Sequence, residues 1–234
     1  MSVLTSLGVL ILTMLSLAFF QLVPSVFSLF LHFTSGRYSK FKTSDLAVFF
    51  ILGTETFTVF ILLFIYFLLF NSPSLFWIID NSVFSWLIAG ILAALGILIF
   101  TLYYRRHSRT ELFISRKLAR SLQARAKTIK TRSDAFALGF TSALPEFAFT
   151  LPLYIVSTIT IMQFNSNAFT RAGIIILFAL FAILPLLIIF FLFNTGHTLA
   201  DSLRFRTRNY HFLRICLALF YFLIAILIIS GAVL

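Results

Sequence analysis

Long apolar runs separated by short polar stretches make up most of the chain. Within each run the apolar residues are continuous and do not alternate with polar ones, which predicts helices rather than strands. Each run is long enough to cross about 30 Å of hydrocarbon at about 1.5 Å per residue. Six such runs occur, at residues 3–33, 46–70, 82–104, 135–162, 172–193 and 211–234. The pattern therefore predicts an all-α integral membrane protein with six transmembrane helices.

The composition agrees with this class. Hydrophobic residues make up 61% of the chain and charged residues only 11%, whereas a soluble domain carries about 25% charged residues. A soluble fold of this size would expose large apolar patches, which aggregate or bind a partner. This excludes a soluble enzyme or a soluble nucleic-acid binder. The single cysteine, Cys216, forms no disulfide within the chain, and we expect no cofactor.

The basic residues lie in alternate links between the runs. All but one of the 18 lysines and arginines fall in the first, third and fifth links, and Arg171 is the exception. Basic loops stay in the cytoplasm under the positive-inside rule. We therefore expect a multi-pass protein of the cytoplasmic (inner) membrane with both termini outside.

The third link, residues 105–133, is the longest polar segment and is strongly basic. Its apolar residues Ile114, Leu118, Leu122 and Ile129 are spaced to share one helical face. We predict an amphipathic helix at the cytoplasmic interface that contacts anionic lipids. The segment has no aromatic interleaving or nucleic-acid motif, so we expect no nucleic-acid partner.

This linker divides the chain into two halves, residues 1–104 and 134–234, each with three predicted spans. The first span of each half carries a proline, Pro24 in LVPSVFSLFL and Pro145 in ALPEFAFTLPL. Because proline removes a helical hydrogen bond, we expect the first helix of each half to be broken there. Three is an odd number of spans, so the second half should be inverted relative to the first. Interrupted helices in inverted halves point to a transporter-type site.

The proline-bearing spans read SLAFFQLVPSVFSLFLHF and DAFALGFTSALPEFAFTLPLYI. With the spans that follow them, they resemble the membrane domains of the cytochrome c biogenesis proteins CcdA and DsbD. More broadly, they resemble the lysine-exporter (LysE) superfamily with its three-plus-three inverted repeat. Thiol-transferring members have a cysteine after the proline in each half, where this chain has Ser25 and Glu146. The resemblance implies the architecture but not the redox chemistry.

Two acidic residues lie deep within the predicted spans. Counted from the cytoplasmic edge, Glu55 is roughly 15 Å deep and Glu146 roughly 18 Å deep. An ionised acid at the bilayer centre costs about 2.5–3.5 kcal/mol on insertion scales, so both should face the bundle interior. We interpret them as the titrating groups of a cation or proton site. Hydroxyl oxygens would come from Ser25, Thr54, Thr56, Thr141 and Ser142, and backbone carbonyls freed at Pro24 and Pro145 would add further oxygen ligands.

Alternatives remain open for these residues. Each glutamate could simply hydrogen-bond a neighbouring helix and fix its packing. Gly53, beside Glu55, is expected to permit close helix packing rather than to bind a ligand.

The first functional hypothesis is a small transporter, an exporter of a cation or of a small amino-acid-like solute, coupled to protons or to another ion. The alternative is a non-redox relative of the cytochrome c biogenesis proteins that acts in membrane protein assembly or maturation. A membrane enzyme is disfavoured, because no nucleophile–base pair or metal signature occurs within the spans. The expected partners are the bilayer, anionic lipids and a small solute or ion. The sequence leaves open whether the chain forms a homo-oligomer.

Overall fold

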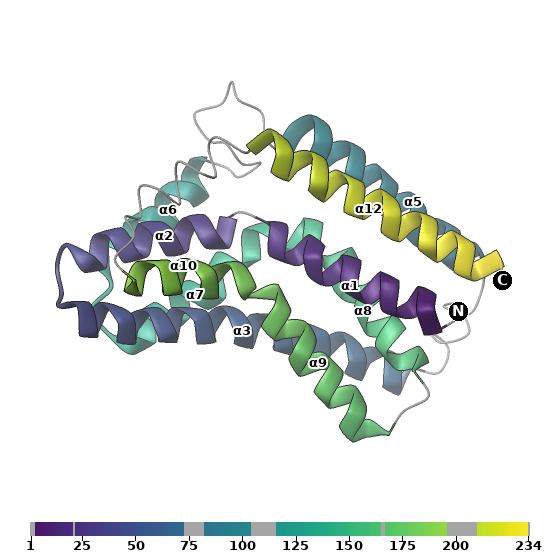
Figure 1. Ribbon diagram of the computed structural model, residues 1–234, viewed down its shortest axis with the longest axis horizontal. Coiled ribbons are helices and arrows are strands. Elements are labelled where there is room, and N and C mark those ends of the chain that lie inside the picture. Colours follow the sequence, from purple (N-terminus) through teal and green to yellow (C-terminus); the bar gives the residue numbers. More distant parts are fainter. Residues whose placement is uncertain are drawn as a thin grey trace.

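The computed structural model describes residues 3–20, 22–72, 82–103, 116–164, 167–195 and 210–233. Throughout these ranges the elements are helices joined by short turns (Figure 1). They are α1 (Val3–Phe19), α2 (Leu22–Ser35), α3 (Lys40–Asn71), α5 (Ser82–Leu98), the π-helical turn η1 (Ile99–Tyr103), α6 (Arg116–Thr128), α7 (Arg132–Ser142), the 3₁₀ turn η2 (Leu144–Glu146), α8 (Phe147–Gln163), α9 (Ala168–Ala182), α10 (Leu184–Asn194) and α12 (Tyr210–Val233).

The predicted all-helical membrane architecture is confirmed in its coarse form. Within the described ranges, four helical stretches are long and apolar enough to cross a membrane, namely Lys40–Asn71, Val83–Thr101, Arg132–Gln163 and His211–Gly231. Two further stretches qualify only as bent pairs. The α1–α2 pair is bent by 40° and the α9–α10 pair by 51°. The count is therefore four to six spans, depending on whether each bent pair forms one span.

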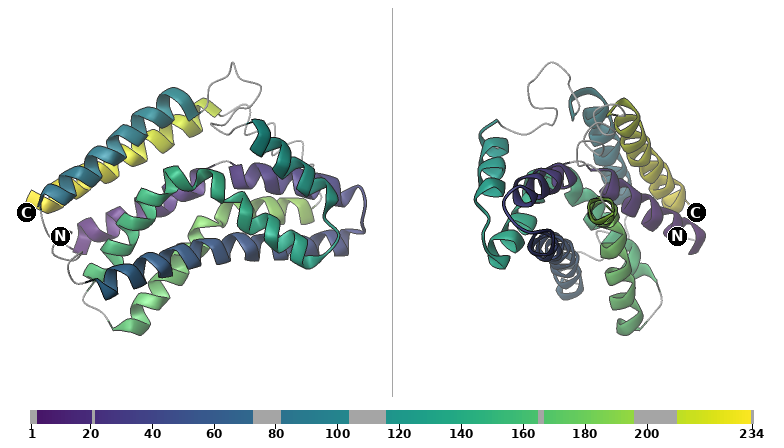
Figure 2. Two further views of the ribbon diagram at one scale, coloured as in Figure 1. Left: turned by 180° about the vertical axis from the view of Figure 1, so that it is seen from behind. Right: turned by 60° about the vertical axis from the view of Figure 1, so that its left-hand side comes forward.

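The two ends of the bundle differ in charge. Both chain termini lie at one end, and the turns that join α2 to α3 and α6 to α7 lie at the other (Figures 1 and 2). The end of α10 is also there, because the Lys40 Nζ atom donates a 2.7 Å hydrogen bond to the Asn194 carbonyl. This end carries the Arg132–Asp45 ion pair, with a shortest N···O distance of 2.8 Å. Lys40 and Arg132 thus lie at this end, whereas Arg171 lies at the start of α9.

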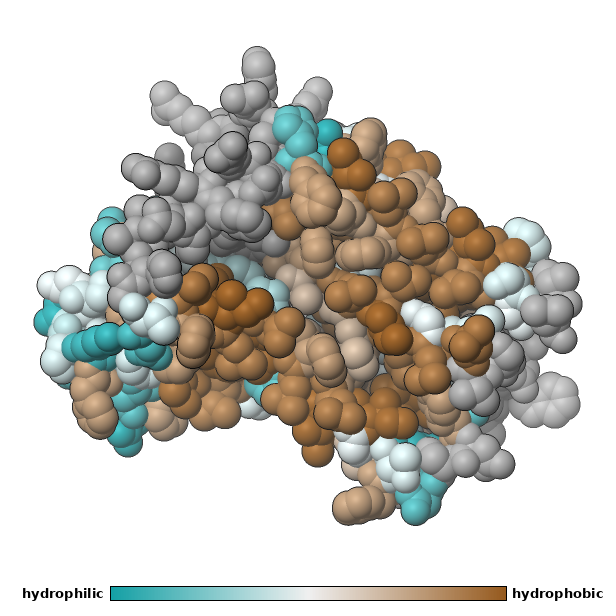
Figure 3. All heavy atoms as spheres, viewed as in Figure 1, coloured by the Kyte–Doolittle hydropathy of each residue, from teal (hydrophilic) through white to brown (hydrophobic). Residues whose placement is uncertain are grey.

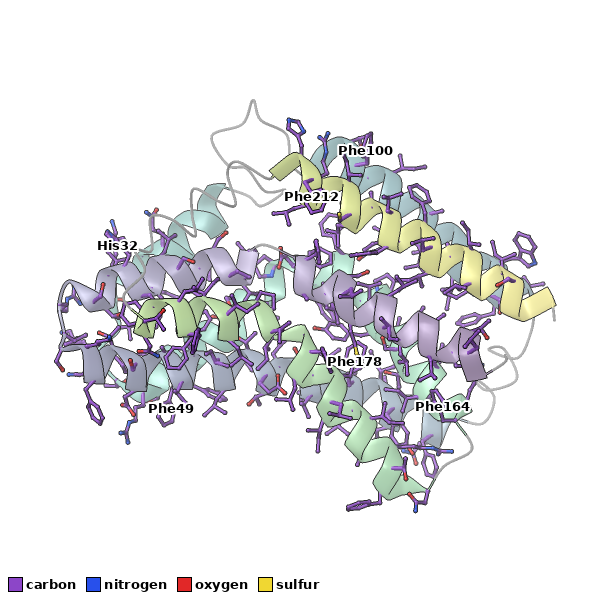
Figure 4. The ribbon with its side chains drawn as sticks, in the orientation of Figure 1. His32, Phe49, Phe100, Phe164, Phe178 and Phe212 are labelled. Atoms are coloured by element: carbon purple, nitrogen blue, oxygen red, sulfur yellow. The ribbon has the colours of Figure 1, made fainter. Side chains whose placement is uncertain are left out.

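Apolar side chains cover the middle of the molecule. Figure 3 shows a broad apolar surface across one face, with polar residues toward its edges. In Figure 4, Phe178 of α9 lies in the interior, whereas Phe100 and Phe212 lie on the outside. Phe178 is fully buried, and Phe212 is 62% exposed. Such a surface suits contact with lipid chains.

Two buried apolar clusters stabilise the bundle and meet at the level of the helix breaks. The first joins α1, the second half of α3, α5, α8, α9 and α12, and includes Leu62, Leu92, Leu153, Phe178 and Tyr221. The second joins α2, the first half of α3, α6, α7 and α10, and includes Phe27, Phe30, Phe50, Leu138 and Leu186. Because each bent helix changes cluster at its bend, the bends lie between two separately packed regions.

The predicted apolar face of the basic linker is buried against protein. Leu122, Ala126 and Ile129 belong to the second cluster, and α6 packs on α2. The Tyr38 hydroxyl donates a 3.2 Å hydrogen bond to the Ile129 carbonyl, which fixes the end of this segment. Of the other predicted face residues, Ile114 lies outside the described ranges, as does the side chain of Leu118.

Helices α3 and α7 approach each other most closely at two glycines. A Cβ atom on Gly53 would overlap the Phe136 carbonyl, and one on Gly139 would overlap the Phe50 carbonyl. The Thr54 hydroxyl also lies 3.4 Å from the Gly139 carbonyl. The contact is reciprocal, since each glycine receives the backbone of the other helix. The predicted packing role of Gly53 is therefore confirmed.

Alanine at either of these glycines should destabilise the fold. We expect Gly53→Ala and Gly139→Ala each to lower the free energy of unfolding by about 1–3 kcal/mol, because backbone cannot move aside as a side chain can. The measurement is thermal unfolding of the purified protein in nanodiscs. Gly90→Ala and Gly173→Ala are matched controls, since nothing lies within 4 Å of a Cβ at either helical site. Equal effects at all four positions would contradict the close approach.

Candidate functional site

Three helix interruptions meet in the middle of the bundle. The chain breaks between α1 and α2, turns through η2 between α7 and α8, and bends between α9 and α10 (Figures 1 and 2). A proline follows each interruption: Pro24 in the first turn of α2, Pro145 in η2 and Pro185 at the start of α10. A first-turn proline lacks only an N–H that has no helical partner, so each proline begins a new segment at little cost.

Two of these interruptions lie where the sequence predicts them. The break before Pro24 bends the first span by 40°. The interruption at Pro145 is milder, because η2 is a 3₁₀ turn inside a stretch that qualifies as a single span, Arg132–Gln163. The third interruption, at Pro185, was missed by the sequence reasoning. Its signal was available in AILPLLI, since the rule applied to Pro24 applies there equally.

Glu146 connects the two halves at this level. Its side chain is buried, with 3% of the residue exposed. The Oε1 atom accepts a 2.9 Å hydrogen bond from the backbone N–H of Leu22, the first residue of α2. First-turn N–H groups have no partner within their helix, and a carboxylate is favoured at this positive end of the helix dipole. The acid from the η2 turn thus caps the helix that begins after the α1–α2 break.

A cavity of about 50 Å³ lies beside this bond, between the three interruptions. Its polar wall consists of Glu146 and four hydroxyl-bearing side chains, from Thr54, Thr58, Thr150 and Tyr154. The other lining residues are Leu17, Ala18, Phe20, Val23, Pro24, Phe57, Ala143, Ala182, Ile183, Pro185 and Leu186. A single buried acid among hydroxyls, in a partly open cavity otherwise lined by apolar side chains, is an arrangement that suits a small polar or cationic ligand.

The three threonine hydroxyls of the wall donate their protons to helix carbonyls. Thr54 donates to the Phe50 carbonyl at 3.1 Å, and Thr58 donates to the Thr54 carbonyl at 3.3 Å. Thr150 donates to the Phe147 carbonyl at 3.4 Å. A hydroxyl that has given its proton to a carbonyl still offers oxygen lone pairs as acceptors. These threonines therefore present acceptors to the cavity, whereas Tyr154 also carries a hydroxyl proton.

A tyrosine supports the helix on which much of this wall lies. The Tyr221 hydroxyl of α12 donates a 2.7 Å hydrogen bond to the Phe149 carbonyl of α8. Pro152 lies inside α8, where its ring disturbs the carbonyls of the preceding turn. The tyrosine thus gives one of those carbonyls a partner from outside its own helix. This contact fixes the first turns of α8, which carry Thr150 and Tyr154.

The structure brings three of the predicted site residues to the cavity: Glu146, Thr54 and Pro24. Sequence reasoning missed Thr58, Thr150 and Tyr154. Threonine is a weak signal, because in a membrane helix it commonly bonds its own backbone and needs no ligand.

The other predicted residues do not line the cavity. Glu55 is partly buried on α3, and its Oε2 atom is buried without a hydrogen-bond partner among the described residues. Thr56 is exposed and donates to the Leu52 carbonyl. Ser142 is buried and donates to the Gly139 carbonyl at 2.7 Å. Ser25 and Pro145 are each one residue along the chain from a lining residue.

In the described part of the chain, no group of three or more His, Cys, Asp or Glu side chains could hold a metal ion. Comparisons of the chain with models of known families, with curated proteins and with solved structures found no significant match.

Replacement of Glu146 separates its capping role from its charge. We expect Glu146→Ala to lower the free energy of unfolding by roughly 1–3 kcal/mol, because it leaves the buried Leu22 N–H unsatisfied. Glu146→Gln keeps an oxygen acceptor and should cost clearly less. Thermal unfolding in nanodiscs measures both. If the glutamine variant unfolded as readily as the alanine variant, the acceptor would not be the stabilising feature.

Proposed function

We propose that this protein is a small multi-pass transporter of the cytoplasmic membrane with both termini outside. The cavity beside Glu146 is its substrate or ion site, and two inverted halves alternate access to it. The cargo is a cation or a small amino-acid-like solute, moved in exchange with or together with protons or another ion. The observation that carries the proposal is the buried Glu146 carboxylate at the meeting point of three helix interruptions.

The pairing of helices supports the inverted arrangement. Helix α5 packs on α12, and these are the last spans of the two halves. The two interrupted first spans also pack on each other, α1 on α8 and α2 on α7. Both pairings are compatible with a pseudo-twofold axis in the membrane plane, since such an axis would map the α1–α8 contact onto the α7–α2 contact and the α5–α12 contact onto itself.

The chemistry of the cavity supports a transport role. A carboxyl in the hydrocarbon region is expensive and is kept mainly where it binds or relays something. Helix segments that end inside the bundle supply backbone carbonyl and N–H groups, which is how many transporters build a site at mid-membrane. The basic end, which includes α6, would face the cytoplasm and contact anionic lipid headgroups.

Flux measurements on reconstituted vesicles test the proposal. The probes are ²²Na⁺, an internal pH-sensitive dye for protons, and radiolabelled lysine. We expect Glu146→Gln to reduce flux of the transported probe by at least about tenfold, because the charge that attracts or exchanges the ion is gone. Glu55→Gln is the matched control, since Glu55 lies on α3 but does not line the cavity.

The folding of each variant is checked by its elution as a single species and by its unfolding midpoint. Equal flux through wild type and a folded Glu146→Gln variant would overturn the site. No flux of any probe, together with a stably co-purifying membrane protein, would instead support the assembly or maturation role.

A further inference from the structure

We infer that the cavity binds one positive charge at a time, either a proton or a single small monovalent cation, and does not take a divalent metal ion or an amino acid. This inference deepens the proposed function, because it names the ligand class of the same site. It rests on the size of the cavity, on its charge and on the type of its polar groups.

Size is the first restriction. The cavity measures about 50 Å³. Because one water molecule needs at least roughly 10–15 Å³, this is room for a few waters or for one ion that keeps part of its hydration. A lysine-like solute has many more non-hydrogen atoms than this space accommodates. Size alone thus favours an ion over the amino-acid-like cargo.

Charge is the second restriction. Among the described residues that line the cavity, Glu146 is the one acid, and there is no lysine, arginine or histidine. One carboxylate balances one positive charge, whereas a divalent ion would leave a net charge buried away from water. An amino acid would also bring a carboxylate for which the described lining offers no basic side chain. The N–H of Leu22 is already bonded to Glu146.

Three of the remaining polar groups are acceptors of the kind that hard cations prefer. The hydroxyls of Thr54, Thr58 and Thr150 each donate to a helix carbonyl and keep their lone pairs. Together with the Glu146 carboxylate, these oxygens would bind a small monovalent ion, or a water that exchanges a proton with Glu146.

Ligand-dependent stability tests the inference without any transport measurement. Thermal unfolding of the full chain in nanodiscs is followed in the chloride salts of Li⁺, Na⁺, K⁺, Mg²⁺, Mn²⁺ and lysine at equal ionic strength, and in a pH series from about 5 to 8. A ligand that binds only the folded state raises the unfolding midpoint in a concentration-dependent way. We expect a rise with one of the monovalent cations, or a dependence on pH alone if the ligand is the proton.

The other titratable groups near the site must be separated from Glu146. Tyr154 of α8 and Tyr221 of α12 lie close enough to interact electrostatically with it, and Glu55 of α3 interacts with Tyr154. Tyrosine ionises only near pH ~10 in water, outside the series. The pH series is therefore run in both wild type and Glu55→Gln, and the dependence should persist in the latter.

Two variants assign the effect to the cavity. Glu146→Gln should lose the cation- or pH-dependent rise, with an apparent affinity at least about tenfold weaker. Thr54→Val should weaken it more than Thr160→Val. Both threonines are buried and bond a carbonyl four residues earlier, but Thr160 does not line the cavity.

The results separate the inference from the proposed function. A rise with Mg²⁺, Mn²⁺ or lysine alone, no rise with any ligand or pH, or a rise that persists in Glu146→Gln would overturn the inference. A monovalent or proton effect that depends on Glu146, in a protein that shows no flux, would uphold the inference and refute transport. Lysine flux without any effect of cations or protons on stability would uphold transport and refute the inference.

Discussion

The hydrogen bond between the Glu146 carboxylate and the Leu22 N–H is the contact on which the middle of the bundle depends. It joins the η2 turn of one interrupted span to the first residue of α2 in another. In a hydrocarbon environment a helix cannot begin inside the bundle unless its free N–H groups find partners. The carboxylate supplies such a partner together with a charge that opposes the helix dipole. Without it, the 40° bend of the first span would place an unsatisfied donor in an apolar interior.

The position of the bends follows from the same constraint. Irregular backbone is tolerated at membrane depth only where protein surrounds it or where it lines a cavity. The three interruptions lie together between the two apolar clusters, and residues from each line a single cavity. Prolines begin or interrupt the segments there at little cost, because each lies in a first turn or in a 3₁₀ turn. Packing on both sides therefore remains regular, and the irregular backbone is confined to one level of the bundle.

Much of this arrangement could be predicted from the sequence, because hydropathy and helical rise depend only on the position of a residue along the chain. The positions of the long apolar helices and the breaks near Pro24 and Pro145 are of this kind. The direction in which a side chain faces depends on tertiary packing and cannot be predicted in this way. Glu55 and Glu146 were placed at similar depth, but Glu55 lies off the cavity on α3 while Glu146 lines it. That difference depends on how α3 packs on α7 through Gly53 and Gly139, a contact between segments far apart in sequence. The threonines that line the cavity could not be predicted for a similar reason. In the sequence, a threonine that lines a cavity cannot be distinguished from one that packs within a helix bundle.

The double role of Glu146 links ligand binding to helix geometry. A charge-assisted hydrogen bond is roughly twice as strong as a neutral one. Any ligand that neutralises the carboxylate, whether a proton or a cation, therefore weakens the cap on α2 at the moment it binds. Helix α2 belongs to one apolar cluster and α1 to the other, so the α1–α2 break lies at the junction between the two packed regions. In a protein with two arrangements that differ in the contact at this break, a ligand that changes the strength of the contact would bind them with different free energies, which is the condition for shifting their populations. The Glu146 carboxylate, which stabilises the bend between α1 and α2, would then also make the stability of that bend depend on whether a ligand is bound in the cavity.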